Sequence, residues 1–214
     1  MMQIHEFGAP EADIVLIQPV DVRELPGMEQ ELAVIRENIK EDFRMIALCV
    51  EDWNCDLSPW PAPPVFGSEG FSGGAERTLA EVLKLCKDKE KRCYLGGYSL
   101  AGLFALWAGC QSDAFAGIAA ASPSVWYPGF DAYLKTHEFH PGSVYLSLGD
   151  REEKTRNPVM AAVGARIRET HELLQGRGIH CTLEWNPGGH FRDAELRTAK
   201  AFFRVIEMQR EIPK

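Results

Sequence analysis

The sequence has no long uncharged apolar run and no excess of positive charge. No stretch of about 18 uncharged apolar residues occurs, so we expect no helix that crosses a membrane. Lys and Arg number 23 against 31 Asp and Glu, which gives a formal net charge of -8 at pH 7. That charge opposes binding to nucleic acid or to an anionic membrane surface, because both are polyanions. The composition favours a small neutral or cationic molecule as the ligand.

Paired cysteines are also lacking. The six cysteines are scattered, and no two of them have the Cys-x-x-Cys spacing of zinc or redox sites. Most lie in apolar runs, where a free thiol behaves as a small hydrophobic side chain. The first residues, MMQIHEFGAPEAD, do not place an apolar stretch after a basic segment, as a secretory leader would. We therefore expect a reducing, cytoplasmic location.

No internal repeat and no low-complexity linker divides the chain. Its 214 residues, 45% of them hydrophobic, can bury a sizeable core. We expect one domain over residues 1–214. The sequence leaves the oligomeric state open between a monomer and a homodimer.

Short apolar runs alternate with longer segments of helical period, which is typical of an α/β fold. Several runs are apolar at successive positions, as in parallel strands buried on both faces. Right-handed crossovers then predict a three-layer α/β/α, doubly wound, mostly parallel sheet. The predicted strands are 14–18, 44–50, 93–98, 116–122, 143–149 and 181–185, with an antiparallel edge strand at 3–7, and the predicted helices are 28–39, 75–87, 100–110, 158–174 and 194–208.

A serine stands at a predicted turn between a strand and a helix. CYLGGYS (93–99) predicts the strand and LAGLFALWAG (100–109) the helix, so the turn would lift the Ser99 side chain above the sheet edge. A hydroxyl there can act as a nucleophile if a base removes its proton and donors stabilise the oxyanion. The backbone N–H of Leu100, at the helix start, is placed to be one such donor. The alternative is that Ser99 only caps the helix.

The residues around this serine depart slightly from the Gly-x-Ser-x-Gly pattern. Gly97 holds the first small position, but Ala101 stands where the second glycine is usual. Alanine adds one methyl group and does not require a positive φ. We expect a tight fit, with the unusual φ at Ser99 itself.

A histidine and three carboxylates follow later strands. His190 lies in NPGGHF, between the last predicted strand and the last predicted helix. Ligands of open α/β sheets bind at the carboxyl ends of the strands, so His190 is a candidate base for the serine proton. Asp150, Glu152 and Glu153 follow the preceding strand, and each could accept the second imidazole N–H. The residues alone do not distinguish the three.

Four segments in this order resemble the α/β-hydrolase fold. More narrowly, they are similar to its esterase family that includes esterase D-like and enterochelin esterase-like enzymes and the mycolyltransferases. The resemblance covers most of the chain from Ile14 onward and implies a small fold with a sheet trimmed at one edge. The segments are GGYSLAGLFALWA, AAASPSVWYPGF, SVYLSLGDREEKT and NPGGHF.

The resemblance implies a serine hydrolase that cleaves a carboxylic ester. Ser99 would be the nucleophile, His190 the general base and then acid, and Glu152 the orienting carboxylate. It implies no metal and no organic cofactor. An acyltransferase or thioesterase would use the same residues, and a noncatalytic protein could keep the scaffold only for binding.

Two oxyanion donors follow from the resemblance. Leu100 N–H would be one, and Val20 N–H, just after the first core strand, would be the other. Related folds often end that strand with a His-Gly pair, whereas this chain has Gln18 and Pro19. Proline has no N–H and a fixed φ, so the oxyanion hole would be reshaped on this side.

Aromatic side chains gather in the predicted loops and suggest an apolar or aromatic acyl pocket. We expect Trp53, Trp126, Tyr127 and Phe191 to line it. The long Pro- and Gly-rich segment 56–74 is predicted to be a loop, and loops of this length in a compact domain are usually functional or mobile. Carboxylates beyond the strand ends, at Asp21 and Asp52, favour a cationic or hydroxyl-bearing substrate.

Overall fold

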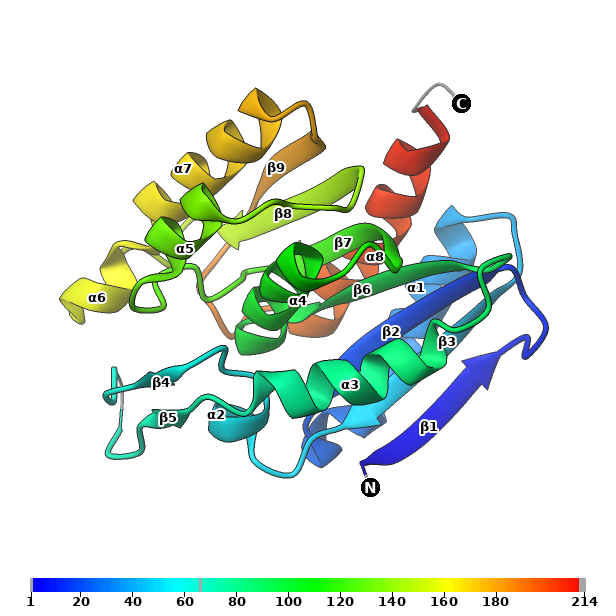
Figure 1. Ribbon diagram of the computed structural model, residues 1–214, viewed down its shortest axis with the longest axis horizontal. Helices are drawn as coiled ribbons and strands as arrows, with labels where there is room; N and C mark the ends of the chain where they lie inside the picture. The colour runs from blue at the N-terminus through cyan, green and yellow to red at the C-terminus, as the bar shows by residue number, and fades with distance from the viewer. Residues whose placement is uncertain (1, 66, 212–214) are drawn as a thin grey trace.

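The computed structural model describes residues 2–65 and 67–211. Within them a seven-stranded sheet, in the order β1-β3-β2-β6-β7-β8-β9, separates two layers of helices (Figure 1). Neighbouring strands are parallel, except that β1 pairs with β3 in the antiparallel sense. The strands are β1 (Gln3–Gly8), β2 (Ile14–Val20), β3 (Phe43–Cys49), β6 (Arg92–Tyr98), β7 (Phe115–Ala121), β8 (Ser143–Gly149) and β9 (His180–Asn186). The predicted doubly wound sheet with an antiparallel edge strand is confirmed.

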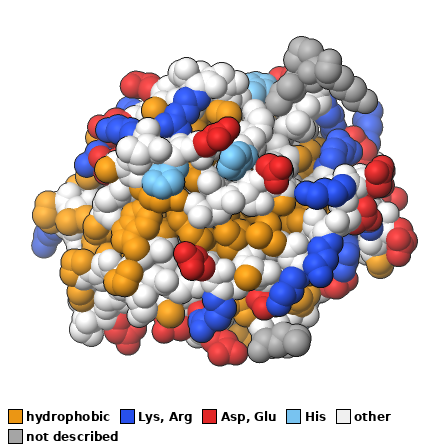
Figure 2. All heavy atoms as spheres, in the orientation of Figure 1, with side chains coloured by type: hydrophobic (Ala, Val, Ile, Leu, Met, Phe, Trp, Pro, Cys, Tyr) orange, Lys and Arg blue, Asp and Glu red, His pale blue; other side chains and the backbone are white. Residues whose placement is uncertain are grey.

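Helices α3, α4, α5 and α7 cover one face of the sheet, and α1 and α8 cover the other (Figure 1). The strands supply both cores by alternation: Val15 and Ile17 of β2 pack toward the first layer, and Ile14 and Leu16 toward the second. The long helices are α1 (Met28–Asn38), α3 (Ala75–Leu85), α4 (Leu100–Gln111), α5 (Phe130–Thr136), α7 (Val163–Gly176) and α8 (Ala194–Glu211). In the orientation of Figure 1, hydrophobic side chains form a band across the middle of the visible face, with charged side chains around it (Figure 2).

Several short elements differ from the sequence prediction. The segment predicted as one helix at 158–174 is divided into α6 (Pro158–Ala161) and α7, and α5 was not predicted. The predicted loop 56–74 contains a small hairpin. The other short elements are the 3-10 helix η1 (Val22–Gly27), α2 (Trp53–Asp56), β4 (Pro61–Ala62) and β5 (Phe71–Ser72). These elements carry little periodic signal because each is only a few residues long.

Strand β2 continues two residues beyond its predicted end, through Pro19 and Val20. The fold accepts the proline because the pairing of β2 with β6 stops at Ile17, opposite Leu95. The Val20 carbonyl accepts from the Val50 N–H on the β3 side (3.0 Å), so Pro19 turns its missing N–H toward the side where the pairing has ended. The predicted end of this strand, at residue 18, is therefore two residues too early.

Among the described residues, no helix combines the length and apolar character needed to cross a membrane.

Candidate active site

Ser99 occupies a sharp turn between β6 and α4. Its φ of 56° and ψ of -117° lie in a region that L side chains rarely adopt. Such a conformation costs roughly 1–3 kcal/mol, and surrounding contacts must hold it. The Ser99 N–H donates to the Ala121 carbonyl (3.1 Å), and the Ser124 N–H donates to the Ser99 carbonyl (3.0 Å). The end of β7 and the segment after it thus fix the serine backbone at the carboxyl edge of the sheet.

The alanine in the serine motif fits because Gly97 faces it. A Cβ added at Gly97 would lie 2.6 Å from the Ala101 Cβ, closer than two carbon atoms can approach. A Cβ at Gly102 would lie 3.1 Å from the Gly97 carbonyl oxygen and from the Pro123 Cβ. Strand β6, helix α4 and the loop after β7 therefore meet at van der Waals distance. Of the facing positions 97 and 101, only one can carry a methyl group.

We expect Gly97→Ala to lower the free energy of unfolding by about 2–3 kcal/mol, because it overpacks this contact. Ala101→Gly should cost about 1 kcal/mol through helix propensity alone. The double variant Gly97→Ala/Ala101→Gly should recover much of the loss, since it exchanges the two side chains. Urea denaturation of the four proteins measures this; a double variant less stable than Gly97→Ala would contradict the facing contact.

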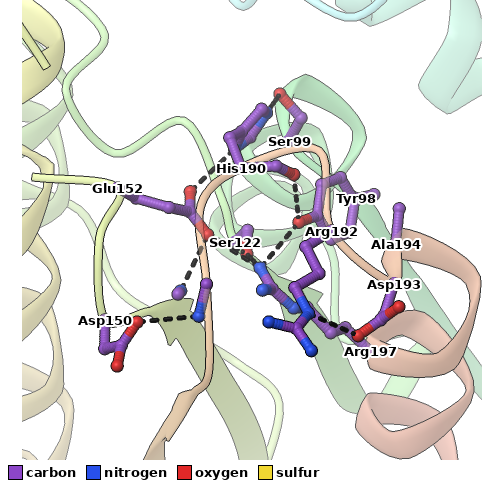
Figure 3. A network of polar contacts seen from close by, with 12 residues as sticks. Tyr98, Ser99, Ser122, Asp150, Glu152, His190, Arg192, Asp193, Ala194 and Arg197 are labelled. Carbon is purple, nitrogen blue, oxygen red and sulfur yellow. Dashed lines mark hydrogen bonds and ion pairs between the residues drawn. The ribbon is translucent and has the colours of Figure 1, made fainter.

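His190 connects Ser99 to a carboxylate (Figure 3). The His190 Nε2 lies 3.0 Å from the Ser99 Oγ, and its Nδ1 lies 2.7 Å from the Glu152 Oε2. The His190 side chain is 24% exposed and that of Glu152 only 4%. The serine comes from the end of β6, the carboxylate from the loop after β8, and the histidine from the loop after β9. The structure thus brings the three predicted residues into one chain of contacts.

The three neighbouring carboxylates have different partners. Asp150 Oδ1 accepts from the Gly188 N–H (2.7 Å), which fixes the start of the histidine loop. Glu153 forms an ion pair with Arg168 (3.4 Å). Glu152 turns inward to His190. The choice that the residues alone left open is therefore resolved in favour of Glu152 as the carboxylate that contacts His190.

Glu152 is buried but well supplied with donors. Its Oε1 accepts from the Ser122 hydroxyl (2.7 Å), the Gly149 N–H (2.7 Å) and Arg197 Nη1 (3.0 Å). Burial acts to raise the pKa of the Glu152 carboxyl, but the hydrogen bond and charge of His190, with the Ser122 and Gly149 donors, hold it below its usual value. The carboxylate is therefore kept ionised beside the imidazole.

The sequence reasoning missed Arg197 and Tyr98. Arg197 donates to Glu152, and the Tyr98 hydroxyl donates to the His190 carbonyl (2.6 Å). A signal was present for Arg197, because it falls on the apolar face of α8, four residues before the buried Ala201. A charged residue at such a position indicates a buried partner. Tyr98, at the end of a strand, gave no comparable signal.

The two backbone amides predicted to be oxyanion donors, those of Leu100 and Val20, differ in their surroundings. Leu100 is the first residue of α4, and the first amides of a helix have no acceptor within the helix. Val20 is fully buried, and its carbonyl faces β3. Because the N–H and C=O of one residue in a strand point to the same side, the Val20 N–H also faces β3, away from the strand that carries Ser99. The following amide, of Asp21, donates to Glu24 Oε2 (2.9 Å).

The four aromatic residues that were predicted to line an acyl pocket differ widely in how deeply they are buried. Trp53 lies in the wall of a surface cleft. Trp126 is 9% exposed and Tyr127 only 2%. The Tyr127 hydroxyl donates to the Trp60 carbonyl (2.6 Å), so its ring anchors the hairpin of β4 and β5. Phe191 is 97% exposed, with its ring edge-on to His190 at 5.2 Å between centroids.

A cleft of about 1080 Å³ opens at the carboxyl ends of β2 and β3. Ser99 and His190 are not in its wall, but Ser99 follows β6, the sheet neighbour of β2. Half of the residues in the wall are acidic, and its Arg23 forms an ion pair with Asp21 (2.8 Å). The acidic residues in the wall are Asp21, Glu24, Glu51, Asp52 and Glu69. These acidic side chains therefore lie at the same edge of the sheet as Ser99.

Across residues 2–65 and 67–211, no three His, Cys, Asp or Glu side chains are arranged to hold a metal ion.

No protein-family model matches the sequence, and no curated protein matches it. Solved structures do match. The siderophore hydrolase EstA from Aspergillus nidulans aligns with a TM-score of 0.68 at 20% identity, over 98% of this chain and 90% of that one. An IroE-like serine hydrolase from Shewanella oneidensis aligns with a TM-score of 0.71 at 13% identity, over 97% and 80% of the two chains. The chain has an α/β-hydrolase fold.

The enterobactin and salmochelin hydrolase IroE shares this α/β-hydrolase fold, with a TM-score of 0.64 at 18% identity over 95% of this chain and 88% of that one. The expected fold class is thereby confirmed. At these identities the comparison concerns the fold, and the chemistry has to be argued from the site itself.

Proposed function

We propose that the protein is a serine hydrolase that cleaves a carboxylic ester through an acyl-enzyme on Ser99. The observation that carries the proposal is the chain of contacts from Ser99 Oγ to His190 Nε2 (3.0 Å) and from His190 Nδ1 to Glu152 Oε2 (2.7 Å). These distances suit proton transfer to a base whose other nitrogen is oriented by a carboxylate. The names of the similar structures, siderophore and enterobactin hydrolases, support this class of reaction.

The reaction proceeds in two halves. In the first, Ser99 Oγ attacks the ester carbonyl carbon while His190 Nε2 takes the hydroxyl proton, and the imidazolium then gives this proton to the departing alcohol. In the second, water attacks the acyl-enzyme, His190 takes a proton from it, and the acid leaves as Ser99 regains its hydroxyl proton. Glu152 accepts the Nδ1–H throughout and stabilises the imidazolium. Leu100 N–H donates to the oxyanion.

A fluorophosphonate probe tests this proposal directly. Such a probe phosphonylates a serine only when the hydroxyl is activated by a base, so we expect one covalent adduct on Ser99. Intact mass measurement followed by peptide mapping locates it. Ser124, whose hydroxyl lies 3.3 Å from the Ser99 Oγ, is the internal control for site selectivity. A protein without an adduct would instead be a binding protein built on the same scaffold.

The acidic cleft predicts the preferred charge of the substrate. Among matched p-nitrophenyl esters, we expect kcat/KM to be about 3–10-fold higher for a cationic than for an anionic acyl group at low salt, because the neighbouring carboxylates repel the anion. The ratio should shrink at high salt through screening. Neutralising two carboxylates of the cleft, in Glu51→Gln/Glu69→Gln, should reduce it. An ester panel measured at two ionic strengths provides the comparison, and a preference for the anionic ester would contradict it.

A further inference from the structure

Arg197 is a charged side chain in the core of the protein. It lies on α8, where only 3% of its surface is exposed, beside the buried Thr198 and Ala199. A buried guanidinium is stable only when it is paired and its N–H groups are satisfied. The groups that pair with the Arg197 guanidinium therefore indicate its role in the protein.

The hydrogen bonds of the Arg197 side chain reach several parts of the active site (Figure 3). Its Nη1 lies 3.0 Å from Glu152 Oε1, 3.0 Å from the Tyr98 hydroxyl and 3.4 Å from the Ser122 hydroxyl. Its Nη2 donates to the Pro187 carbonyl (3.1 Å). One guanidinium thus joins the end of β6, the loop after β8 and the loop that carries the histidine.

These contacts fix the histidine from two sides. The Tyr98 hydroxyl, which accepts from Arg197, donates to the His190 carbonyl (2.6 Å). Pro187 lies three residues before His190, so the bond to its carbonyl holds the start of the same loop. Arg197 does not contact Ser99 or the cleft. It can therefore affect the reaction only through the groups that it positions and through its charge.

The charge of Arg197 balances that of Glu152. The carboxylate is shared between the guanidinium on Oε1 and the imidazole on Oε2, and both side chains of this ion pair are almost fully buried, at 3% and 4% exposure. A carboxylate that is already paired attracts a second positive charge less strongly than an unpaired one does. Without Arg197, the imidazole would therefore face an unpaired carboxylate.

We propose that Arg197 is a positioning residue that also compensates the charge of Glu152, and so sets the charge that His190 faces when it accepts the Ser99 proton. This role rests on the proposed hydrolase function. The groups that face the pair from each packed element are Tyr98 from β6, Ser122 after β7 and Asp150 after β8, and Asp150 is held on the Gly188 N–H. At the start of α8, Asp193 pairs with Arg192 at the surface.

The test is the pH profile of kcat/KM for a neutral ester. In Arg197→Met we expect the acid limb to move to higher pH by about one unit, since the imidazole then faces an unpaired carboxylate. The matched control is Arg204→Met on the same helix, whose arginine pairs with Glu184 and Glu207 at the surface. The acid limb of the Arg204→Met profile should coincide with that of the wild-type protein. An unmoved limb in Arg197→Met, or an equal shift in both variants, would overturn the proposal.

The variant Arg197→Lys distinguishes the effect of the charge from the effect of positioning. It also tests the proposal if Arg197→Met does not fold. An ammonium keeps the charge but cannot contact Glu152, Tyr98 and Pro187 together. We expect an unchanged acid limb, an unchanged KM and a kcat lowered by about 3–10-fold. A wild-type kcat in Arg197→Lys would overturn the positioning role. Failure of the wild type to label at Ser99 would refute the hydrolase function itself, a result distinct from either outcome for Arg197.

Discussion

Replacement of Ser99 by alanine is expected to lower kcat/KM for ester hydrolysis by on the order of 10⁵-fold. The hydroxyl is the only part of the side chain that takes part in the proposed reaction, and the remaining activity would come from binding and the oxyanion donor. His190→Gln should lose a similar factor, because a serine without its base is a poor nucleophile. The measurement is steady-state hydrolysis of a p-nitrophenyl ester, with the melting temperature recorded for each variant.

The control for this prediction is Ser124→Ala. The Ser124 hydroxyl lies 3.3 Å from that of Ser99 and is 2% exposed, so its removal changes the site by a similar volume. We expect a loss of less than about tenfold, since the hydrogen bonds of the His190 ring go to Ser99 and Glu152 and not to Ser124. If Ser124→Ala lost as much activity as Ser99→Ala, or if Ser99→Ala remained active, the assignment of the nucleophile would be wrong.

The second large effect concerns stability rather than activity. Glu31, on α1, is 2% exposed, and burial raises the pKa of its carboxyl to about 8, with the nearby carboxylates Glu24 and Glu195 acting in the same direction. Its Oε2 accepts from the Gln18 side-chain amide (3.4 Å). In the described part of the chain, Glu31 Oε1 and Gln18 Oε1 have no hydrogen-bond partner. An ionised carboxylate there is poorly compensated.

The direction of the pH dependence follows from the raised pKa. The folded state holds the Glu31 proton more tightly than the unfolded chain does, so the stability from this group is complete below the unfolded pKa and is lost as pH rises through about 8. At about 1.4 kcal/mol per pKa unit, the free energy of unfolding should fall by about 3 kcal/mol between about pH 4.5 and about pH 7 from this group.

Glu31→Gln should remove this decline and raise the free energy of unfolding at neutral pH by about 2 kcal/mol, because an amide stays neutral and can donate to the Gln18 Oε1. Urea denaturation at several values from about pH 5 to about pH 8 measures the effect. Glu29→Gln, on the exposed side of the same helix, is the matched control and should leave the profile unchanged. Parallel profiles for Glu31→Gln and the wild type would contradict the prediction.

The strands of the large sheet and its mostly parallel, doubly wound class were predictable from the sequence because the pattern that specifies them is local and repeated. Each buried strand is a short apolar run, and the helices of eleven or more residues, α1, α3, α4, α7 and α8, are long enough to be recognised from their apolar residues, whereas the seven-residue α5 is not. The short elements were missed for the opposite reason. The hairpin of β4 and β5 exists because Trp60 and Tyr127 attach it to the rest of the protein, with Trp60 Nε1 donating to the Pro128 carbonyl (2.9 Å).

The predicted aromatic pocket shows how far loop residues can be placed from sequence. Tyr127 is 2% exposed and Phe191 is 97% exposed, although both are aromatic residues in loops at the same end of the sheet. Composition cannot separate them, because the depth of a loop side chain depends on which segment packs over it. Only Trp53 of the four lies in the wall of the large cleft.

The sequence by itself determined the strand, turn and helix around Ser99 and the order in which the serine, the carboxylates and the histidine follow the strands, because these depend on neighbouring residues. The tertiary structure alone decided that Glu152 faces His190, across 38 positions of the chain, and that Arg197 supports it from 45 positions away. Contacts over such separations are set by how the loops and α8 pack on the sheet. Local periodicity carries no information about that packing.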